Sequence, residues 1–386
     1  MSYYVLPRAS LTIYHYIDCI LKCGHDIPVI SNTLANYLYA IKEKIDDCER
    51  DWDIFKKYTN PYEYIHTMVP YKKNCVAKYK PLSRSYYKMI EIIHTFNILP
   101  DQPTINTFHL AEGPGGFIEA VANIRKQSND KYTGITLMAD MNDPNIPGWK
   151  KTNNFLRANP NVEIIYGADG TGDILSLQNM MDCNEKYASS MDLVTADGGF
   201  DFSSDFNKQE TSISFLLFAQ VTYALILQKH GGSFVLKLFD CFMQHTVDIL
   251  YILSAFYKKV YVSKPQTSRN ANSEKYIVCK DFIHHSNCEF LPYFYRAFEK
   301  MLMDKPPNLP ICVHRFLNMP IPLYFTNKLE EYNAIFGQQQ IENIQYTISL
   351  IENKHNQEKI DKLIRNNIQK CINWCNKYHI QHHIIM

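Results

Sequence analysis

The chain has 386 residues, of which 46% are hydrophobic and 20% are charged. That is enough apolar side chain to bury a core and too little charge for a disordered chain. Lys plus Arg number 40 and Asp plus Glu number 39, so the net charge of +1 excludes a protein that coats nucleic acid by bulk positive charge. No apolar run reaches ~18 residues, so we expect no membrane span, and the first residues lack the features of a secretory signal.

The N-terminal part of the chain is predicted to be helical, with the clearest periodicity at residues 34–45. A basic segment with interleaved tyrosines follows, from Tyr71 to Lys88. It is either a solvated loop leading into a helix or a surface that holds phosphates and stacks on a base. Ser83 is expected to cap the helix that carries Lys88.

From about residue 105, strands alternate with helices. This alternation predicts an α/β fold in which a mainly parallel sheet is covered by helices on both faces. In such folds a ligand lies beyond the carboxyl ends of the strands, where the strand order reverses. The predicted strands are residues 106–111, 132–138, 162–166, 192–196, 233–238, 260–263 and 275–279, and the predicted helices include residues 120–126, 212–228 and 247–256.

The chain is predicted to become helical again after Phe290, at residues 294–303, 327–336, 341–352 and 359–377. We therefore predict three parts: an N-terminal helical extension over 1–55, a sheet domain over 56–290 and a C-terminal helical extension over 291–386. The C-terminal extension either packs on the sheet domain or contacts a partner.

The cysteine pattern argues against disulfides and against zinc. Eleven cysteines without a CxxC pair are typical of reduced thiols in an intracellular protein. Cys and His lie near one another at residues 19–25 and at 371–379. In a helix, however, positions 371 and 379 are about 12 Å apart along the axis, too far for one tetrahedral ion. We expect no metal site.

A glycine-rich turn is the most specific local signal. Leu110-Ala111-Glu112-Gly113-Pro114-Gly115-Gly116-Phe117 lies between a predicted strand and a predicted helix. Glycines let a backbone approach a ligand closely, and the helix N-terminus offers unpaired N–H groups. The spacing differs from G-x-G-x-x-G, and no Lys-Ser/Thr pair follows, which excludes a Walker-type phosphate site. Taken alone, the turn is equally compatible with a structural role.

This turn resembles the S-adenosylmethionine loop of the FtsJ-like ribose 2′-O-methyltransferases. The resemblance extends over roughly residues 56 to 282 and is greatest to the eukaryotic-type and large-DNA-virus mRNA cap methyltransferases. It implies a Rossmann-like class I methyltransferase domain over 56–290, with S-adenosylmethionine as cofactor and no metal. The other motifs that carry it are Asn60-Pro61-Tyr62-Glu63, Ser83-Arg84-x-x-x-Lys88, Gly170-x-Gly172-Asp173-Ile174, Ala196-Asp197-Gly198-Gly199, Lys237-Leu238-Phe239-Asp240 and Lys264-Pro265-x-Thr267-Ser268-Arg269-x-Ala271-Asn272-Ser273-Glu274-x-Tyr276.

Four charged residues are the candidate catalytic group: Lys88, Asp197, Lys237 and Glu274. Asp197 and Lys237 end predicted strands and Glu274 opens another, so the three can converge at one sheet edge. On sequence alone each is more simply a surface or ion-paired charge, but the family's Lys-Asp-Lys-Glu tetrad falls on these positions. A lysine acts as a base for an alcohol only if its pKa is lowered from ~10.4 towards neutrality.

The resemblance implies a role for each of the four. Lys237 would be the general base for the 2′-hydroxyl, and Lys88 the second cation that lowers its pKa and helps hold the ribose. Asp197 would orient Lys237 near the sulfonium, and Glu274 would fix a lysine by a charge-assisted hydrogen bond.

The resemblance also implies two sets of binding residues. For Asp140, with Asn142 and Asp143 beyond it, two roles are open: it either binds a ribose diol of the cofactor or starts a turn. Candidates for stacking on the cap guanine are Tyr58, Tyr62, Phe202 and Phe206. The expected cofactor-binding residues are Ser83, Glu112, Gly113, Pro114, Gly115, Gly116, Phe117, Asp173, Ile174 and Asp197, and the expected RNA-binding residues are Lys56, Asn207, Lys208, Gln209 and Asn272.

These features favour an S-adenosylmethionine-dependent mRNA cap methyltransferase that modifies the 2′-oxygen of the first transcribed nucleotide. The alternatives are the same reaction on the second cap nucleotide or on rRNA or tRNA, and a non-catalytic RNA-binding subunit of a capping complex. The expected partners are capped mRNA and other capping or transcription proteins, with no membrane. The expected location is intracellular: the nucleus or the cytoplasm, including a viral factory or virion if the source is a virus.

Overall fold

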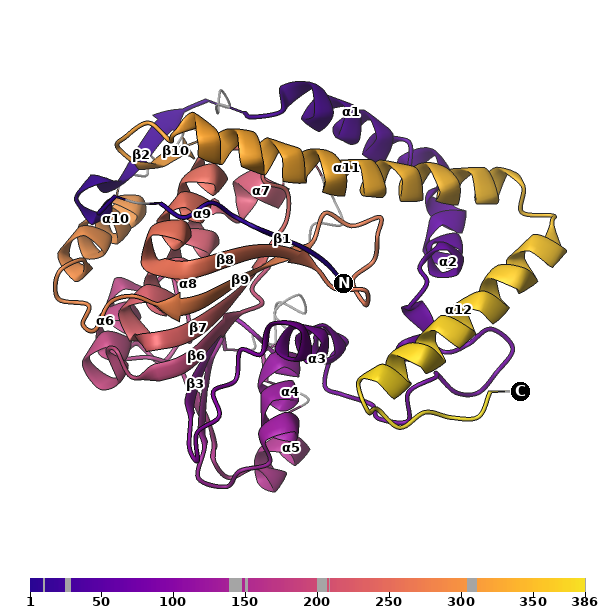
Figure 1. Cartoon of the computed structure of the whole chain (residues 1–386), viewed down its shortest axis with the longest axis horizontal. Coiled ribbons are helices and arrows are strands. Elements are labelled where there is room, and N and C mark those ends of the chain that lie inside the picture. The colour runs from indigo at the N-terminus through magenta and orange to yellow at the C-terminus, as the bar shows by residue number, and fades with distance from the viewer. Residues whose placement is uncertain are drawn as a thin grey trace.

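The computed structural model describes residues 1–9, 11–24, 29–138, 148–149, 152–199, 207, 209–303 and 311–385. Its centre is an eight-stranded sheet in the order β1-β8-β9-β7-β6-β3-β4-β5, around which the helices are arranged (Figure 1). The strands are β1 (Ser2–Val5), β3 (Asn106–Leu110), β4 (Lys131–Ile135), β5 (Val162–Ile165), β6 (Met191–Ala196), β7 (Gln228–Leu238), β8 (Tyr257–Lys264) and β9 (Lys275–Phe282).

The pairing of these strands is mostly parallel, as the sequence predicted. Strands β5, β4, β3, β6 and β7 form a continuous parallel block, and the pairs β7–β9, β9–β8 and β8–β1 are antiparallel. The chain runs outward from β3 to β5 and then returns to the other side of β3 at β6. This places the reversal of strand order at the β3–β6 boundary, the ligand-binding position of such folds.

Both faces of the sheet are buried, so the central strands β3 and β6 are buried along almost their whole length. Val194 and Phe234 belong to the core cluster on one face, whereas their neighbours Leu193 and Val235 belong to the cluster on the other. The first face is covered by α6 (Leu177–Tyr187), α8 (Ser214–Leu227), α9 (Gln244–Phe256) and α10 (Leu291–Met303), and the second by α3 (Ser85–Phe96) and α4 (Gly116–Arg125).

The N-terminal region differs from the predicted helical extension, because it contributes two strands. Strand β1 pairs with β8 and forms one edge of the central sheet. A second strand, β2 (Ile17–Cys23), pairs with β10 (Ile311–Leu317) from the C-terminal region. These pairings join segments more than 250 residues apart, and a strand of four residues has too little periodicity to be recognised in sequence.

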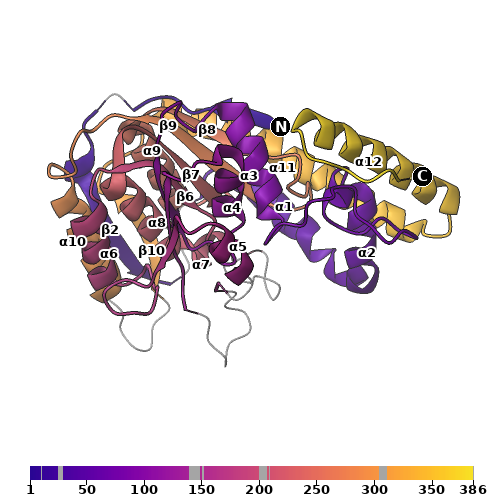
Figure 2. The same cartoon turned by 90° about the horizontal axis from the view of Figure 1, so that it is seen from below.

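Four helices from the two ends of the chain form a lobe against the sheet domain. They are α1 (Asn32–Glu43), α2 (Glu49–Thr59), α11 (Leu323–Glu352) and α12 (Gln357–Lys377). Helix α11 runs across the molecule beside α1, and the two stretches predicted as separate helices within it form one continuous helix (Figure 1). Figure 2 shows α2 and α12 together at the end of the molecule opposite α6 and α10.

One local prediction was wrong. The helix that carries Lys88 begins at Ser85 and has no side-chain cap, because the hydroxyl of Ser83 is hydrogen-bonded to the Ser85 hydroxyl at 2.6 Å instead. Helices α6 and α5 (Asn153–Ala158) were not predicted, and α7 (Gln209–Ser212) is separate from α8. Within the residues described, no helix is long and apolar enough to cross a membrane.

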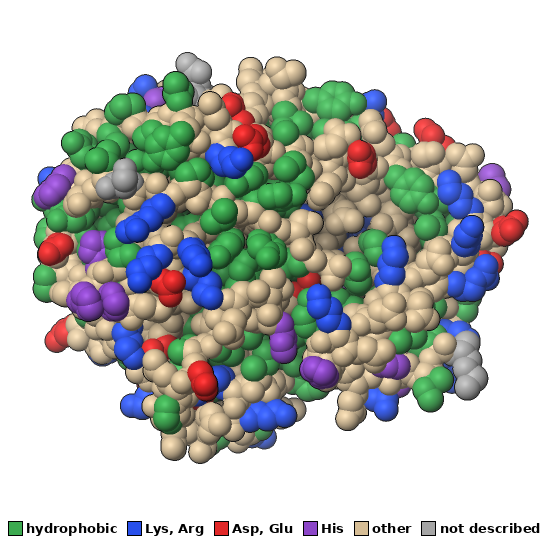
Figure 3. Space-filling model, in the orientation of Figure 1, with side chains coloured by type: hydrophobic (Ala, Val, Ile, Leu, Met, Phe, Trp, Pro, Cys, Tyr) green, Lys and Arg blue, Asp and Glu red, His purple; other side chains and the backbone are tan. Residues whose placement is uncertain are grey.

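The surface agrees with the balanced charge of the sequence. On the face of Figure 3, Lys and Arg side chains stand in small groups with Asp and Glu scattered among them, and hydrophobic side chains gather over β1. Tyr3 and Val5 of that strand are about half exposed, at 49% and 51%. A nucleic acid would therefore have to be held by local groups of cations.

Candidate active site

A cleft of about 580 Å³ lies at the carboxyl ends of β3, β4, β6 and β7. This volume is within the range of about 300–1,000 Å³ that is usual for small-ligand sites. Seven of the residues predicted to bind the cofactor line it: Ser83, Glu112, Gly113, Pro114, Asp173, Ile174 and Asp197. The three others, Gly115, Gly116 and Phe117, do not line the cleft; they form the start of α4.

The glycine turn brings two helix N-termini together at this cleft. A Cβ at Gly116 would lie 2.2 Å from the Ser85 hydroxyl and 2.3 Å from the Ser83 hydroxyl, so only glycine permits the contact between the starts of α3 and α4. Gly115 has φ +104°, a conformation that favours glycine. Phe117 is fully buried and packs on Tyr276, with ring centroids 5.7 Å apart.

Glu112 lies between the turn and the sheet. Its Oε1 accepts a hydrogen bond from the Thr195 hydroxyl, and its Oε2 lies 3.4 Å from Nδ1 of His109. Burial raises the pKa of Glu112 above its usual range. Besides this contact with His109, Oε2 has no hydrogen-bond partner among the described residues, so it can also accept from a donor on a bound molecule.

A second glycine loop forms the opposite wall. Gly172 has φ +71°, and a Cβ there would lie 2.0 Å from the carbonyl oxygen of Thr136. This close approach sets the loop against the end of β4, where Thr136 and Leu137 also line the cleft. The Asp173 carboxylate accepts a 2.8 Å hydrogen bond from the Leu175 backbone N–H and remains part of the cleft wall.

The structure brings Lys88, Asp197, Lys237 and Glu274 together at one end of the cleft as two ion pairs. Lys88 Nζ lies 2.7 Å and 2.8 Å from the two carboxylate oxygens of Glu274. Lys237 Nζ lies 3.5 Å from Oδ1 of Asp197 and 3.3 Å from its carbonyl oxygen. Lys88 comes from α3, Asp197 follows β6, Lys237 is near the end of β7 and Glu274 precedes β9.

Tyr276 joins the two pairs. Its hydroxyl donates a 3.0 Å hydrogen bond to Oδ1 of Asp197 and accepts one of 3.5 Å from Lys88 Nζ. Burial raises the pKa of Tyr276 well above its usual value, so the hydroxyl keeps the proton that it donates. The sequence analysis included this tyrosine in a motif but gave it no role, because a tyrosine within a predicted strand is ordinarily a core residue.

The two lysines differ in how they are held. The Lys88 side chain is 4% exposed and the Lys237 side chain 17% exposed. Burial lowers the pKa of Lys88, an effect that Glu274 opposes and Lys237 adds to. For Glu274, burial favours the neutral form, but the adjacent Lys88 and Lys237 outweigh it and hold the pKa of this carboxyl below its usual range. Lys237 is thus the more accessible amine.

The loop before Glu274 is fixed from three sides. The Glu91 carboxylate accepts hydrogen bonds of 2.8 Å each from the backbone N–H groups of Gln266 and Thr267. Glu63 forms a two-point ion pair with Arg269, at 2.6 and 2.9 Å. Lys264, whose pKa burial and the neighbouring Lys275 lower to about 7, donates to the carbonyl oxygens of Asn272 and Glu274. These contacts hold the backbone that presents Glu274.

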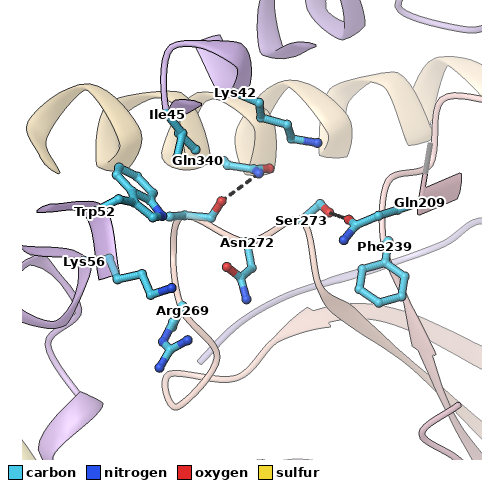
Figure 4. Close-up of a pocket in the computed structure, with 11 residues that line it drawn as sticks. Lys42, Ile45, Trp52, Lys56, Gln209, Phe239, Arg269, Asn272, Ser273 and Gln340 are labelled. Carbon is cyan, nitrogen blue, oxygen red and sulfur yellow. Dashed lines mark hydrogen bonds between the residues drawn. The ribbon is translucent and has the colours of Figure 1, made fainter. Parts of the chain in front are cut away.

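Three of the five residues predicted to bind RNA line a separate pocket of about 200 Å³: Lys56, Gln209 and Asn272. Figure 4 shows Asn272 in its centre, with Trp52 on one side and Phe239 on the other. We call it the Trp52 pocket; Lys42, Arg269, Ser273 and Gln340 also line it. Phe239 connects it to the catalytic group, because Lys237 Nζ lies 5.6 Å from the centre of the Phe239 ring.

Helices of the terminal lobe form the far wall of the Trp52 pocket. Trp52 and Lys56 come from α2, Lys42 from α1 and Gln340 from α11. Gln340 donates a 2.9 Å hydrogen bond to the carbonyl oxygen of Ala271, and Gln209 accepts one of 3.0 Å from Ser273 (Figure 4). The sequence gave no signal for Trp52, which lay within the predicted N-terminal extension.

The remaining predicted residues are placed elsewhere. Asn207 is described but lines neither cavity. Tyr62 accepts a hydrogen bond from Gln266 and Tyr58 packs on Phe55. Within the described ranges, no three His, Cys, Asp or Glu side chains are grouped as metal ligands. Lys208, Asp140, Asn142, Asp143, Phe202 and Phe206 lie outside the described residues.

The strand order, the glycine turn after β3 and the cleft at the reversal of strand order define a Rossmann-like methyltransferase fold of class I. The family profile described as FtsJ-like methyltransferase matches residues 81–282, more than half of the chain. The chain therefore belongs to the FtsJ-like methyltransferase family, whose methyl donor is S-adenosylmethionine.

Similar proteins agree with this placement. Over 363 residues, the chain is 30% identical to "Cap-specific mRNA (nucleoside-2'-O-)-methyltransferase 2" of Mus musculus. The matched region covers 91% of this chain and 45% of the relative. It is 29% identical to the Danio rerio protein of the same name, over 82% of this chain and 43% of the relative. It is 34% identical to "Cap-specific mRNA (nucleoside-2'-O-)-methyltransferase 1" of Trypanosoma brucei brucei, over 50% of this chain and 52% of the relative. The chain thus spans less than half the length of the first two.

Proposed function

We propose that this chain transfers a methyl group to a ribose 2′-hydroxyl of capped mRNA, at the first transcribed nucleotide, with residues 56–290 as the catalytic domain. The observation that carries the proposal is the pair of joined ion pairs at the end of the glycine-lined cleft. The named relatives support mRNA as the substrate class.

Lys237 is the general base of the proposed reaction. Its amine is the more accessible of the two and is held loosely, by contacts of 3.3 and 3.5 Å. The Lys88 amine, in contrast, is bound closely to both oxygens of Glu274. A base must reach the proton that it removes, which favours Lys237.

The other residues of the group orient the reactants. Asp197 holds the Lys237 ammonium and places a negative charge in the cofactor cleft. Tyr276 fixes Asp197, and Glu274 neutralises Lys88 and keeps it in place. Because the fold holds these groups before substrate arrives, little reorganisation is needed during the reaction.

The cleft residues fit S-adenosylmethionine. When bound, this cofactor supplies an activated methyl group on a sulfonium. Besides its 3.4 Å contact with His109 Nδ1, Glu112 Oε2 has no hydrogen-bond partner among the described residues, and the cofactor's amino group is a matching donor. The N-termini of α3 and α4 meet at the same end of the cleft, where their N–H groups favour a carboxylate. Asp173, on the opposite wall, is a hydrogen-bond acceptor for the adenine amino group.

The Trp52 pocket is the proposed site for the cap. It adjoins the catalytic group through Phe239, combines an indole ring with amide side chains, and contains the cation Lys56. A ring, amides and a cation are suited to a base and the phosphates attached to it.

The test is methyl transfer from labelled S-adenosylmethionine to short transcripts of one sequence, followed by nuclease digestion and mass spectrometry. We expect label on the first transcribed nucleotide of capped RNA and at least tenfold less on uncapped RNA. Label on the second nucleotide would move the assignment by one position. Equal label on uncapped RNA would reject cap specificity, and binding without methylation would indicate a non-catalytic subunit.

A further inference from the structure

A further groove adjoins the cofactor cleft at the start of α3. It has a volume of about 470 Å³ and is lined by Thr67, Tyr79, Lys80, Ser83, Arg84 and Arg269, among others. It shares Ser83 and Arg84 with the cofactor cleft and Arg269 with the Trp52 pocket. The three cavities therefore meet around the catalytic group. We call it the Lys80 groove.

The Lys80 groove carries uncompensated positive charge. Lys80 and Arg84 form no ion pair with any residue that the structure describes, and none of the described lining residues is acidic. Arg269 is already paired with Glu63. Arg84 lies one helical turn before Lys88 at the start of α3, so its charge is close to the reaction site. Two unpaired cations at such a position are suited to phosphate oxygens.

The surface beyond the groove is also rich in exposed lysine and tyrosine side chains. Tyr71 is 88% exposed, and Lys72, Lys73 and Lys78 are exposed on the same segment. Exposed tyrosines among lysines provide stacking surfaces and phosphate contacts along a single strand. A strand leaving the Lys80 groove would therefore meet further contacts.

The Trp52 pocket and the Lys80 groove differ in size and in openness to solvent. This difference indicates which way a bound RNA strand runs between them. The Trp52 pocket is the smaller of the two, at about 200 Å³, and is bordered by α1, α2 and α11, which suits a chain end. The Lys80 groove is larger and more open to solvent, so a chain can continue through it. The capped 5′ nucleotide is an end, whereas the rest of the transcript must leave the site.

We propose that the Lys80 groove binds the transcript on the 3′ side of the methylated ribose, with Lys80 and Arg84 holding phosphates of the following nucleotides. This inference rests on the proposed function for the identity of the substrate. It assigns a direction to the RNA: the cap end in the Trp52 pocket, the reacting ribose at Lys237, and the body of the transcript over Lys80 towards Tyr71.

The first experiment compares RNA length and salt. Capped RNAs of two and eight nucleotides are bound to the full chain, with fluorescence anisotropy as the readout and saturating S-adenosylmethionine present. We expect the longer RNA to bind more tightly, and Lys80→Gln to remove most of that gain. The slope of log affinity against log salt should fall by about 0.7 for each lost phosphate contact with single-stranded RNA. Arg84→Gln should lower the slope similarly; cofactor binding by that variant is measured separately.

The matched control is Lys131→Gln. Lys131 is exposed at the start of β4, beside a cavity at the amino ends of the strands, and the substitution removes the same charge. The control should keep the wild-type gain with length and the wild-type salt slope. If Lys80→Gln and Arg84→Gln behave like this control, the inference is wrong, whether or not the RNA is methylated. Because binding is read directly, loss of methylation alone would count against the proposed function and leave this result intact.

The second experiment tests the direction. A 4-thiouridine at the third or fourth nucleotide of the capped RNA is cross-linked by light, and the attached peptide is identified. We expect attachment within residues 66–84. Attachment to residues of the Trp52 pocket instead would reverse the assigned direction and overturn the inference.

Discussion

Tyr276 and Asp197 are joined by a 3.0 Å hydrogen bond that links two otherwise separate ion pairs. The donor is fixed, because burial keeps the tyrosine protonated and Phe117 packs on its ring. Asp197 is thereby held between a neutral donor and the Lys237 ammonium. The carboxylate can keep one orientation while the amine beside it changes its protonation state.

We therefore expect Tyr276→Phe to reduce kcat by about 10- to 100-fold, the effect of losing one hydrogen bond to a charged group. The affinity for S-adenosylmethionine should change by less than threefold, because the ring and the cleft remain. Single-turnover methylation and calorimetry measure the two quantities. Tyr261→Phe, on neighbouring β8 and packed on Phe96, is the control and should leave both unchanged. A kcat of Tyr276→Phe equal to that of the control would remove Tyr276 from the proposed mechanism.

Substitution of Lys237 separates chemistry from binding. Lys237→Ala should abolish methyl transfer, because no other accessible amine lies beside Asp197 among the described residues. Cofactor affinity should remain near the wild-type value. Calorimetry with S-adenosylmethionine and a methylation assay test this together. Loss of both properties in the same variant would instead indicate that Lys237 supports the structure of the cleft.

Substitution of Asp173 should weaken cofactor binding and leave the methyl-transfer step almost unchanged. Asp173→Ala removes the proposed acceptor for the adenine amino group and also the acceptor of the Leu175 N–H. We expect cofactor affinity to fall about tenfold, as for the loss of a hydrogen bond to a charged group, with kcat at saturating cofactor within a few fold of wild type. Asp173→Asn keeps an oxygen for Leu175 and should bind the cofactor with intermediate affinity. Unchanged affinity of both variants would reject the assignment.

The parts of the fold that sequence could predict are those with local signals. Strands β3, β6 and β7 each contain a short cluster of apolar residues, and a glycine turn marks the end of the first. Asp197 and Lys237 lie at the ends of such strands, so topology alone places them at one edge. Which charged residues at that edge act together came only from the resemblance.

The parts that sequence could not predict depend on long-range contacts. Nothing near β1 indicates that it pairs with β8 about 260 residues later. The Trp52 pocket combines residues of α1, α2 and α11 with the loop before Glu274, and no single segment carries its pattern. Tyr276 occupies a position in β9 that is typical of a buried core residue. Only its hydrogen bonds with Asp197 and Lys88 distinguish it from one.

The N-terminal helix is joined to the catalytic half by a buried ion pair. Lys42 Nζ of α1 lies 2.9 Å from Oδ2 of Asp240, which follows β7, and both side chains are buried. Removing one partner of a buried pair leaves a charge without compensation and typically costs about 3–5 kcal/mol. Because Lys275 Nζ remains 4.0 Å from Oδ1 of Asp240, Lys42→Met should lower the free energy of unfolding by the smaller of these values, about 3 kcal/mol, in chemical denaturation.

The exposed pair between Lys354 and Asp51 provides the control for Lys42. Both pairs join the terminal helices to another segment, but Lys354→Met removes an exposed charge and should cost less than about 1 kcal/mol. If Lys42→Met is no more destabilising than Lys354→Met, the buried pair does not hold α1 to the sheet domain.

Glu210 makes the stability of the catalytic edge depend on pH. Its carboxylate accepts the backbone N–H groups of Phe242 and Met243, and burial raises its pKa from 4.5 to about 7. Between these two values the folded chain binds more protons than the unfolded chain, so this group reduces stability as pH rises from about 4.5 to 7. Glu210→Gln cannot ionise, and its single oxygen accepts only one of the two N–H groups, a loss that does not vary with pH. The Tm of the variant minus that of wild type should therefore increase steadily from pH 5 to pH 7.5, as measured by thermal unfolding.

Glu289→Gln, at an exposed position, should show no such increase. A constant difference for Glu210→Gln across this range would show that Glu210 has an ordinary pKa in the folded chain.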